Sequence, residues 1–276
     1  MTETITDPEI GSTIEAGGVS TNYHDAGTGA PVLLIHGSGP GVSAWANWRG
    51  VLPLLAAGRR VIAPDVVGFG YSDRPEGFAF TRESWVAHLL SFLDALELEK
   101  VSVVGNSFGG ALGLWVATKY PERVDRLVLM GSAGTSFEIT PGLEAVWGYE
   151  PSVQNMSRLL DIFAYDKSVL GPDLARLRYD ASVRPGVRES YSAMFPAPRQ
   201  KGVDALAVPE DALRSLPHDT LIVHGREDKV IPLSSSLLLS RLIPRSQLHV
   251  FGQCGHWTQI ERRADFVRLL DGFLPG

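Results

Sequence analysis

The sequence predicts an α/β protein in which a mostly parallel sheet is flanked by helices and carries one inserted helical segment. Short runs rich in Val, Leu and Ile recur along the chain, and each ends at or near a Gly or an Asp. Stretches with helical spacing separate these runs, which is the pattern of parallel strands joined by crossover helices. The 276 residues are enough for one such core with an insertion.

Each expected strand is a short run of β-branched and leucine residues. In chain order these runs are residues 32–35, 60–63, 101–104, 127–130, 221–223 and 248–251. Between the second and third runs we expect a helix over residues 81–98, because Trp85, Leu89 and Leu93 recur at helical spacing. Thr81 offers a hydroxyl group that can cap the start of this helix.

The alternation of strands and helices stops after Met130 and resumes at Thr220. The segment between them is rich in proline and in short helical patterns, so we expect a mostly helical lid over residues 135–209. Residues 1–134 and 210–276 would then form the core. An insertion between two strands of an open parallel sheet lies over the carboxyl ends of the strands, where such sheets bind ligands.

Composition and charge limit the partners of the protein. The net charge is −6 and the chain has no run of basic residues, which argues against binding to nucleic acid or to an anionic membrane surface. No apolar run approaches the roughly 20 residues that a membrane-spanning helix requires. The single cysteine, Cys254, cannot form an internal disulfide, and residues 1–10 lack the pattern of a secretory signal. We therefore expect a cytoplasmic protein with a small-molecule partner.

A candidate nucleophile lies directly after the third expected strand. Residues 105–109 read Gly-Asn-Ser-Phe-Gly, which matches the motif G-x-S-x-G, and a helical stretch follows from Ala111. This motif forms a sharp turn that exposes the serine oxygen, and it requires small residues on both sides. The amino end of the following helix can stabilise a developing negative charge. A glycine turn without chemistry is the alternative, but the position of the motif favours Ser107 as the nucleophile of an α/β-hydrolase fold.

The base and the acid should follow the last two expected strands. A serine nucleophile needs a histidine to take its proton and a carboxylate to orient that histidine, and in this fold the chain order is serine, acid, histidine. His256 lies in the loop after the last strand, and residues 225–229 after the preceding strand contain both Glu227 and Asp228. We favour Asp228, because the Val-Ile-Pro run after it would fix its direction. A surface ion pair is the alternative for this residue.

A second glycine-rich loop follows the first expected strand. Residues 36–41 read His-Gly-Ser-Gly-Pro-Gly and resemble the loop that contributes a backbone amide to the oxyanion hole of α/β hydrolases. We expect the amide of Ser38 to be one donor. The amide of Phe108, directly after the nucleophile, would be the other. A plain glycine turn is again the alternative.

Together these motifs resemble one family, the meta-cleavage product hydrolases, over essentially the whole chain. These enzymes split a carbon–carbon bond in 2-hydroxy-6-oxohexa-2,4-dienoates, which are ring-fission products of aromatic catabolism. The matching segments are residues 37–41, 45–48, 105–110, 225–228 and 254–257 of the core, with 145–149 and 161–166 of the lid. The two lid segments resemble members that act in monocyclic aromatic pathways.

The resemblance implies a function and a set of residues. It implies hydrolysis of a dienoate to 2-hydroxypenta-2,4-dienoate and a carboxylic acid by Ser107, His256 and Asp228, without a metal or an organic cofactor. It also implies a homo-oligomer. A guanidinium such as that of Arg178 can bind the substrate carboxylate with two hydrogen bonds, although an ion pair on the helix surface is the alternative. The substrate contacts that the resemblance implies are Ser38, Gly39, Asn47, Asn106, Ser168, Arg178 and Trp257.

Several alternatives stay open. A carboxylesterase or lactonase would use the same triad and oxyanion hole, and a ligand-binding receptor on this fold could keep an intact triad with slow turnover. We expect the acyl substituent to be hydrogen, methyl or a small branched alkyl group rather than phenyl. Trp147, Met156 and Met194 could line the pocket for this group, with packing in the core as the alternative. The sequence does not decide between an acyl-enzyme route and a gem-diol route.

Overall fold

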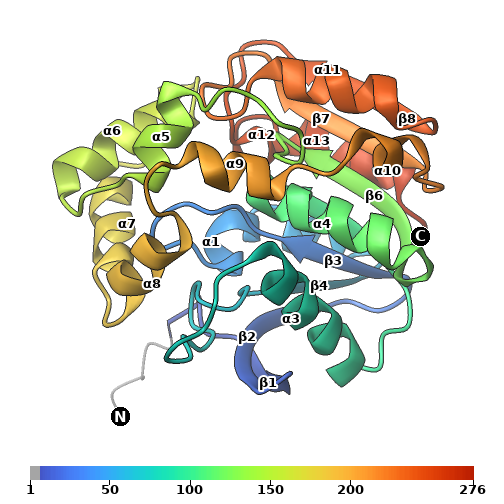
Figure 1. Cartoon of the computed structure of the whole chain (residues 1–276), viewed down its shortest axis with the longest axis horizontal. Coiled ribbons are helices and arrows are strands. Elements are labelled where there is room, and N and C mark those ends of the chain that lie inside the picture. The colour runs from blue at the N-terminus through green and yellow to red at the C-terminus, as the bar shows by residue number, and fades with distance from the viewer. Residues whose placement is uncertain (1–6) are drawn as a thin grey trace.

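The centre of the molecule is a sheet within residues 7–276, the part of the chain that the computed structural model describes. Its strands are β1 (Ser12–Ala16), β2 (Val19–Ala26), β3 (Pro31–Ile35), β4 (Arg60–Pro64), β5 (Val101–Asn106), β6 (Val124–Met130), β7 (Thr220–Gly225) and β8 (Ser246–Phe251). Their order across the sheet is β1-β2-β4-β3-β5-β6-β7-β8 (Figure 1). β1 and β2 are antiparallel to their neighbours, and β3 to β8 run parallel. The carboxyl ends of the parallel strands therefore meet at one edge.

Helices cover both faces of the sheet because the strand side chains alternate between two apolar cores. Leu33 and Ile35 belong to one core, whereas Val32 and Leu34 belong to the other. On the first face lie α3 (Arg82–Ala95), α4 (Phe108–Lys119) and α11 (Leu233–Leu242). The opposite face is covered by α1 (Ala44–Trp48), α2 (Leu52–Leu55) and α13 (Arg263–Phe273), and the short α12 (Thr258–Glu261) precedes α13. A short 3-10 turn, η1 (Pro121–Arg123), leads into β6.

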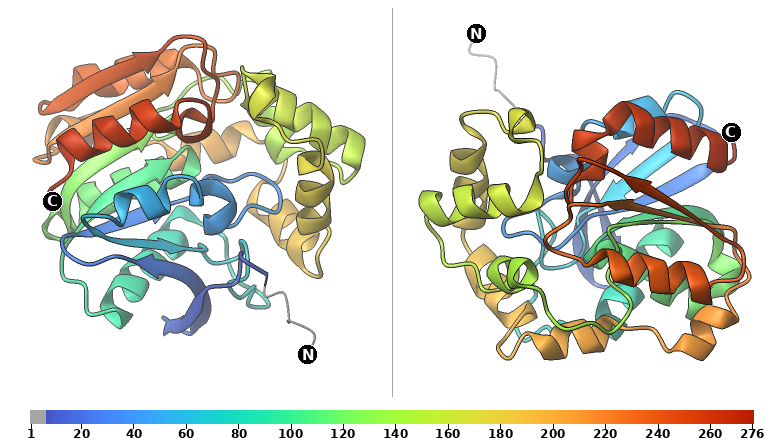
Figure 2. Two further views of the ribbon diagram at one scale, coloured as in Figure 1. Left: turned by 180° about the vertical axis from the view of Figure 1, so that it is seen from behind. Right: turned by 90° about the horizontal axis from the view of Figure 1, so that it is seen from above.

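The long connection between β6 and β7 carries a group of short helices that we call the lid. Figures 1 and 2 show α5 to α8 gathered beyond one end of the sheet. Their contacts with the loop after β3 place the lid at the carboxyl ends of the strands. The elements of this connection are α5 (Pro141–Trp147), α6 (Val153–Phe163), η2 (Lys167–Val169), α7 (Leu174–Ser182), α8 (Val187–Met194), α9 (Gln200–Leu206) and α10 (Glu210–Arg214).

The predicted α/β architecture is confirmed, and all six expected strands lie within β3 to β8. The expected helix at residues 81–98 is α3, and the Thr81 hydroxyl accepts a hydrogen bond from the Ser84 amide in a capping box. The helix ends earlier than expected, because Glu97 adopts a left-handed conformation with φ 56°. β1 and β2 add an antiparallel edge, where the mixed exposure of the side chains weakens the strand pattern.

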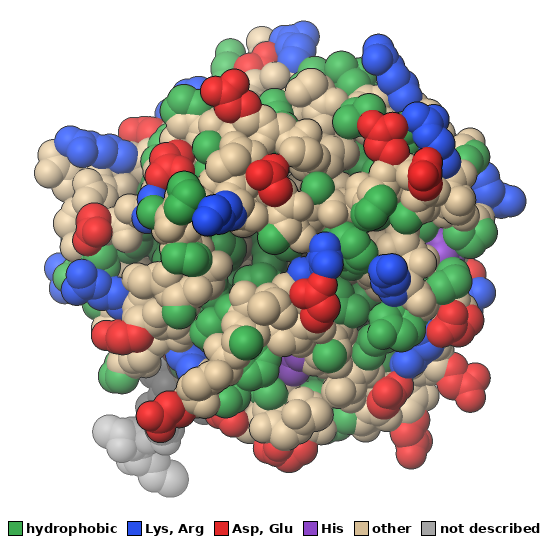
Figure 3. Space-filling model, viewed as in Figure 1, with side chains coloured by type: hydrophobic (Ala, Val, Ile, Leu, Met, Phe, Trp, Pro, Cys, Tyr) green, Lys and Arg blue, Asp and Glu red, His purple; other side chains and the backbone are tan. Residues whose placement is uncertain are grey.

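The surface carries charges of both signs. Figure 3 shows acidic and basic side chains interspersed over the visible face, with no broad basic area. Among the helices of residues 7–276, none combines the length and the apolar character that crossing a bilayer would demand.

Candidate active site

Ser107 stands at a strained turn between β5 and α4. Its backbone has φ 54° and ψ −113°, a region that L-residues rarely adopt. The backbone at the end of β3 approaches this turn so closely that glycine is needed at residue 109, since a Cβ there would lie 2.4 Å from the Ile35 carbonyl oxygen. The turn therefore lifts the Ser107 side chain out of the sheet at its carboxyl edge, as the motif predicts.

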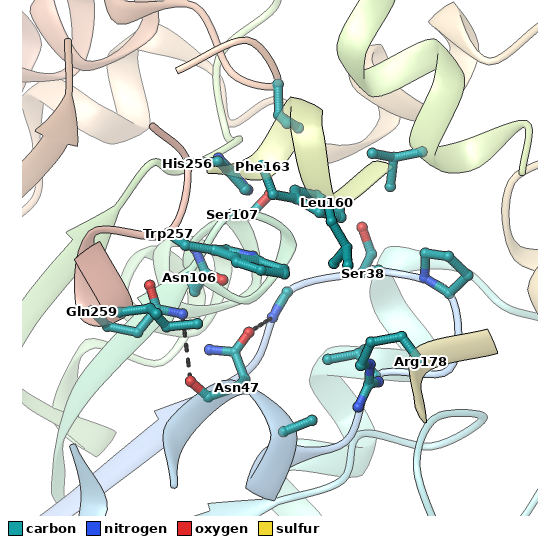
Figure 4. Close-up of a pocket in the computed structure, with 18 of the residues that line it drawn as sticks. Ser38, Asn47, Asn106, Ser107, Leu160, Phe163, Arg178, His256, Trp257 and Gln259 are labelled. Carbon is teal, nitrogen blue, oxygen red and sulfur yellow. Dashed lines mark hydrogen bonds between the residues drawn. The ribbon is translucent and has the colours of Figure 1, made fainter. Parts of the chain in front are cut away.

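Asp228 and His256 are brought together by the loops after β7 and β8. The His256 Nδ1 atom lies 2.7 Å from Asp228 Oδ2, and both side chains are almost completely buried. A carboxylate only accepts, so Nδ1 carries the proton and Nε2 is left as the basic nitrogen. No hydrogen bond joins Ser107 Oγ to this ring among the described residues, but both side chains line the same cavity (Figure 4).

The second oxygen of Asp228 is held by the main chain. Asp228 Oδ1 accepts hydrogen bonds from the amides of Val230 at 2.7 Å and Ile231 at 3.0 Å. Burial alone would raise the pKa of this carboxyl, but His256 and these amides favour the ionised form and hold the pKa below its usual range. The Val-Ile-Pro run thus orients the carboxylate that faces the histidine.

His224 and Gly131 complete the surroundings of this pair. His224 Nε2 donates to the Ile231 carbonyl oxygen at 3.1 Å and lies 3.5 Å from Asp228 Oδ2. Burial lowers the pKa of His224, so this ring supports the loop in its neutral form. Gly131 has φ 48°, and a Cβ there would lie 3.2 Å from both Asp228 Oδ2 and His256 Nδ1. A larger residue at this position would press on the pair.

Two backbone amides are free to bind an oxyanion. Within residues 7–276, neither the Ser38 amide nor the Phe108 amide donates a hydrogen bond to another residue. The peptide that carries the Ser38 N–H is fixed on its other side, because His36 Nδ1 donates to the Gly37 carbonyl oxygen at 2.7 Å. Burial lowers the pKa of His36 to about 4. The ring therefore stays neutral near pH 7 and holds this peptide in place.

One cavity lies between these groups and the lid (Figure 4). Ser107, His256, Ser38, Gly39 and Trp257 line it. Figure 4 shows His256 and Phe163 on one side of the cavity and Asn47 and Arg178 on the other. Most of the apolar lining comes from the lid, with Val230 from the loop after β7, and it includes Leu143, Val146, Met156, Leu160, Phe163 and Val230.

Arg178 reaches the cavity from α7. Its guanidinium donates to the Gly41 carbonyl oxygen and lies 3.4 Å from Glu9 Oε1, and only 13% of its side chain is exposed. Burial lowers the pKa of Arg178, an effect that the Glu9 carboxylate opposes. Arg178 does not form the surface ion pair that was its alternative role. Arg176 makes the pair with Asp180 instead.

Two buried amide side chains leave polar atoms without partners in the described part of the chain. Asn47 Oδ1 accepts from the Gly37 amide at 3.3 Å, whereas Asn47 Nδ2 and Gln259 Oε1 are unpaired. Gln259 Nε2 donates to the Asn47 carbonyl oxygen at 3.4 Å, so the two residues form one polar wall (Figure 4). Unpaired buried polar atoms are costly unless a ligand satisfies them. Asn106, which also lines the cavity, donates instead to the Met130 carbonyl oxygen at 3.2 Å.

Gln259 was not predicted from the sequence, and the structure places Ser168 outside the cavity. Gln259 follows His256 by three residues on α12, and this spacing after the base was the available signal. Ser168 does not reach the cavity, because it is exposed in η2 with its amide bound by Asp166 Oδ1 at 2.9 Å. The neighbouring Val169 lines the cavity in its place.

Of the three lid residues considered for the pocket, only Met156 lines the cavity. Trp147 and Met194 are buried against other side chains of the lid and core. In residues 7–276 no group of three His, Cys, Asp or Glu side chains could hold a metal ion.

The fold and the geometry of the site are those of the α/β hydrolases. A family model described as an alpha/beta hydrolase fold matches residues 30–263. A 2-hydroxymuconate semialdehyde hydrolase of Pseudomonas sp. (strain CF600) is 62% identical, with 97% of this chain and 94% of that protein covered. A 2-hydroxy-6-oxo-2,4-heptadienoate hydrolase of Pseudomonas putida F1 is 61% identical, with 96% of each chain covered.

Solved structures agree with these relatives. A meta-cleavage product hydrolase from Pseudomonas fluorescens IP01, complexed with acetates, has a TM-score of 0.96 and 61% identity over 97% of this chain and 98% of that chain. The chain belongs to the meta-cleavage product hydrolases of the α/β-hydrolase superfamily.

Proposed function

We propose that this protein hydrolyses a carbon–carbon bond in a 2-hydroxy-6-oxohexa-2,4-dienoate, a product of aromatic ring fission. The observation that carries the proposal is one cavity that joins Ser107, His256 and Ser38 to a buried arginine and a polar wall. An ester hydrolase needs the first set of groups but has no use for a buried guanidinium. A substrate with a carboxylate at one end and a ketone at the other uses both sets.

The substrate carboxylate would bind beside Arg178, where Asn47 Nδ2 can donate to it as well. Gln259 Oε1 can accept from the 2-hydroxyl group of the dienol. The acyl end would then lie against the apolar lid side chains. This orientation puts the 6-oxo carbon near Ser107, between the two ends of the cavity.

The reaction needs a proton transfer before the bond can break. The dienol first ketonises with protonation of C5, and His256 is placed to manage this proton. Attack on the 6-oxo carbon produces an oxyanion that the Ser38 and Phe108 amides stabilise. The bond between C5 and C6 then breaks, and the electron pair leaves as a stabilised dienolate. Water supplies the hydroxyl group of the acid, either through an acyl-Ser107 intermediate or through a gem-diol.

We propose a small acyl substituent, from hydrogen to a short alkyl group. The support comes from the names of the relatives, since those 61–62% identical are hydrolases of a semialdehyde and of a heptadienoate. A hydrolase named for the phenyl substrate is only 33% identical. We further propose that the enzyme acts in the cytoplasm, where a buried free thiol such as that of Cys254 stays reduced.

The test uses ring-fission products made enzymatically from catechol, 3-methylcatechol and 2,3-dihydroxybiphenyl. We expect rapid loss of the yellow dienolate absorbance with the first two and slower loss with the third. Ser107→Ala should lose the activity, whereas Ser240→Ala, a substitution on α11 far along the chain from the motif, should retain it. Fast turnover of p-nitrophenyl esters without bleaching of any dienoate would contradict the proposal and favour a carboxylesterase.

A further inference from the structure

The Ser38 loop is held by two buried hydrogen bonds from the lid. The Trp147 indole Nε1, at the end of α5, donates to Ser38 Oγ at 3.0 Å. The Tyr191 hydroxyl, on α8, lies 2.9 Å from the Ser38 carbonyl oxygen and 2.8 Å from the Val146 carbonyl oxygen. These lid residues are 109 and 153 positions from Ser38 in the sequence, so only the seated lid brings them to this loop.

The donor and acceptor roles in these bonds are fixed by chemistry. An indole nitrogen only donates, so Ser38 Oγ accepts from Trp147 and its own proton is free to turn toward the cavity. A carbonyl oxygen only accepts, so the single Tyr191 proton is shared between two carbonyl groups. Among the described residues, the Ser38 carbonyl oxygen has no donor other than Tyr191. Removal of this hydroxyl would leave a buried carbonyl without a partner.

The core holds the preceding peptide of the same loop. His36 fixes the Gly37 carbonyl oxygen, which belongs to the peptide that carries the Ser38 N–H. The side chain and the carbonyl group of Ser38 are fixed by the lid. The direction of the Ser38 amide therefore depends on contacts from both sides of the cavity.

An aromatic contact links the lid to the second amide. The Phe195 ring, at the end of α8, stacks on Trp147 with centroids 4.6 Å apart and an angle of 6°. It also meets Tyr191 edge-on at 5.3 Å and Phe108 edge-on at 6.2 Å. Phe108 supplies the other amide of the expected oxyanion hole, so one lid cluster touches both residues that would form it.

The geometry points to Trp147 and Tyr191 as positioning residues that set the oxyanion hole of this enzyme, so that the hole is aligned only when the lid is seated. The inference rests on the proposed function, because it assumes that the Ser38 and Phe108 amides stabilise an oxyanion. Neither side chain lines the cavity, so their effect should appear in the rate of the chemical step and not in binding.

The test compares Tyr191→Phe and Trp147→Phe with the wild type on two substrates. The methyl-substituted dienoate uses the whole cavity, whereas p-nitrophenyl acetate needs the nucleophile and the oxyanion hole but not the arginine wall. Loss of an oxyanion-hole donor lowers kcat by about 10²–10³-fold, and a misaligned donor should cost less. We expect kcat to fall about 5- to 30-fold on both substrates, with KM changed by less than about twofold.

Tyr149→Phe is the matched control. Tyr149 is also a lid tyrosine, but its hydroxyl bonds Ser182 Oγ at 3.2 Å and the Ser152 carbonyl oxygen at 3.4 Å, and its side chain does not line the cavity. Its kcat should equal that of the wild type on both substrates. Circular dichroism and thermal melting report whether each variant is folded, and Trp147→Phe serves as the test if Tyr191→Phe does not fold.

Three results would overturn the inference. These are an unchanged kcat in folded variants, a change confined to KM, and a loss on the dienoate that the ester does not share. If the wild type hydrolyses the ester but bleaches no dienoate, the proposed function fails separately. The ester measurements then still decide whether the lid positions the oxyanion hole.

Discussion

Asp228 and Glu227 are neighbours in one loop, yet their carboxylates have different surroundings. The Asp228 side chain is 1% exposed and faces His256, whereas the Glu227 side chain is 25% exposed. Glu227 accepts from the Cys254 amide at 3.0 Å and pairs with Arg226. The shorter side chain therefore reaches the histidine, and the longer one ties two surface loops together.

We predict that Asp228→Asn and Glu227→Gln will differ in activity. An amide at residue 228 cannot hold His256 in the tautomer with a basic Nε2, so kcat on the dienoate should fall by roughly 10³–10⁴-fold. Glu227→Gln should stay within about threefold of the wild type. Steady-state kinetics of the two folded variants check this. A larger loss of activity in Glu227→Gln would show that Glu227, and not Asp228, orients His256.

The two arginines of α7 provide a second matched pair. Arg178→Lys should raise KM for the dienoate by about 10- to 100-fold, because an ammonium cannot replace two parallel hydrogen bonds to a carboxylate. Hydrolysis of p-nitrophenyl acetate, which lacks a carboxylate, should not change. Arg176→Lys, at an exposed ion pair, is the control. Equal KM values for the two variants would remove Arg178 from the substrate site.

Residues fixed by motif and chain order were predictable from the sequence, and residues fixed by packing were not. Ser107 and His256 follow strands that the apolar runs identify. Their position at the carboxyl ends of the parallel strands was therefore predictable. Gln259 lines the cavity because α12 turns its side chain toward the Asn47 carbonyl oxygen. Ser168 points away because η2 lies on the surface. Both outcomes depend on how short helices dock, and local patterns do not contain this information.

Among the elements, the end of α6 contacts the loop that carries His256. We call this contact, between residues 163–165 and residues 255–261, the joint. The His256 amide donates to the Phe163 carbonyl oxygen at 2.7 Å, and the Phe163 ring stacks on Trp257 with centroids 4.8 Å apart. Glu261 crosses the same joint. Its carboxylate accepts from the Gly255 amide at 2.9 Å and from the Tyr165 amide at 2.9 Å. The end of α6 is thus tied to the loop that carries the base.

We predict that Glu261→Gln will loosen this joint. The amide group of glutamine offers one acceptor oxygen where the carboxylate has two, and its NH₂ would face backbone donors. Loss of a hydrogen bond to a charged group costs about 1.5–3 kcal/mol. Hydrogen exchange of amides in residues 163–170 should therefore quicken by about 10- to 100-fold.

Glu150→Gln is the control for this measurement, because Glu150 is an exposed lid carboxylate with only a distant partner at 3.8 Å. Unchanged exchange in Glu261→Gln would show that the joint does not depend on this carboxylate.

In the whole molecule, buried ionisable groups make stability depend on pH. Burial lowers the pKa of both His36 and His88 to about 4 from 6.5. Below pH 6.5 these two rings bind protons in the unfolded chain but stay neutral in the folded protein. Their contribution to the free energy of unfolding is therefore fully present above pH 6.5 and is lost as the pH falls toward 4. Asp65 acts in the opposite direction, since burial raises its pKa to about 6 from 3.8. Two histidines outweigh one aspartate over this window.

We predict that the free energy of unfolding will fall by on the order of 3 kcal/mol between about pH 7 and pH 4.5. Urea denaturation at a series of pH values measures it. His88→Gln should flatten the dependence, because the amide can still donate to Thr21 Oγ1 but does not titrate. His249→Gln, on the edge strand β8, is the control. A slope unaffected by His88→Gln would contradict the assignment.

The overall architecture was predictable because the five central strands β3 to β7 are apolar runs that are mostly buried on both faces. The edge strand β8 is only partly buried, but it is also a short apolar run. The antiparallel edge of β1 and β2 was not recognised as a strand pair, since their side chains alternate irregularly between buried and exposed positions. The lid helices are short and separated by prolines, so their bounds depend on contacts with the core.

Hydrolysis of a carbon–carbon bond at Ser107 is best tested by the identity and ratio of the products. Loss of colour alone would also follow from ketonisation without cleavage. The methyl-substituted dienoate should yield acetate and 2-hydroxypenta-2,4-dienoate in equal amounts, as measured by chromatography and mass spectrometry, and Ser107→Ala should yield neither. Bleaching without release of acetate, or equal release by the variant, would show that Ser107 does not catalyse hydrolysis of the carbon–carbon bond.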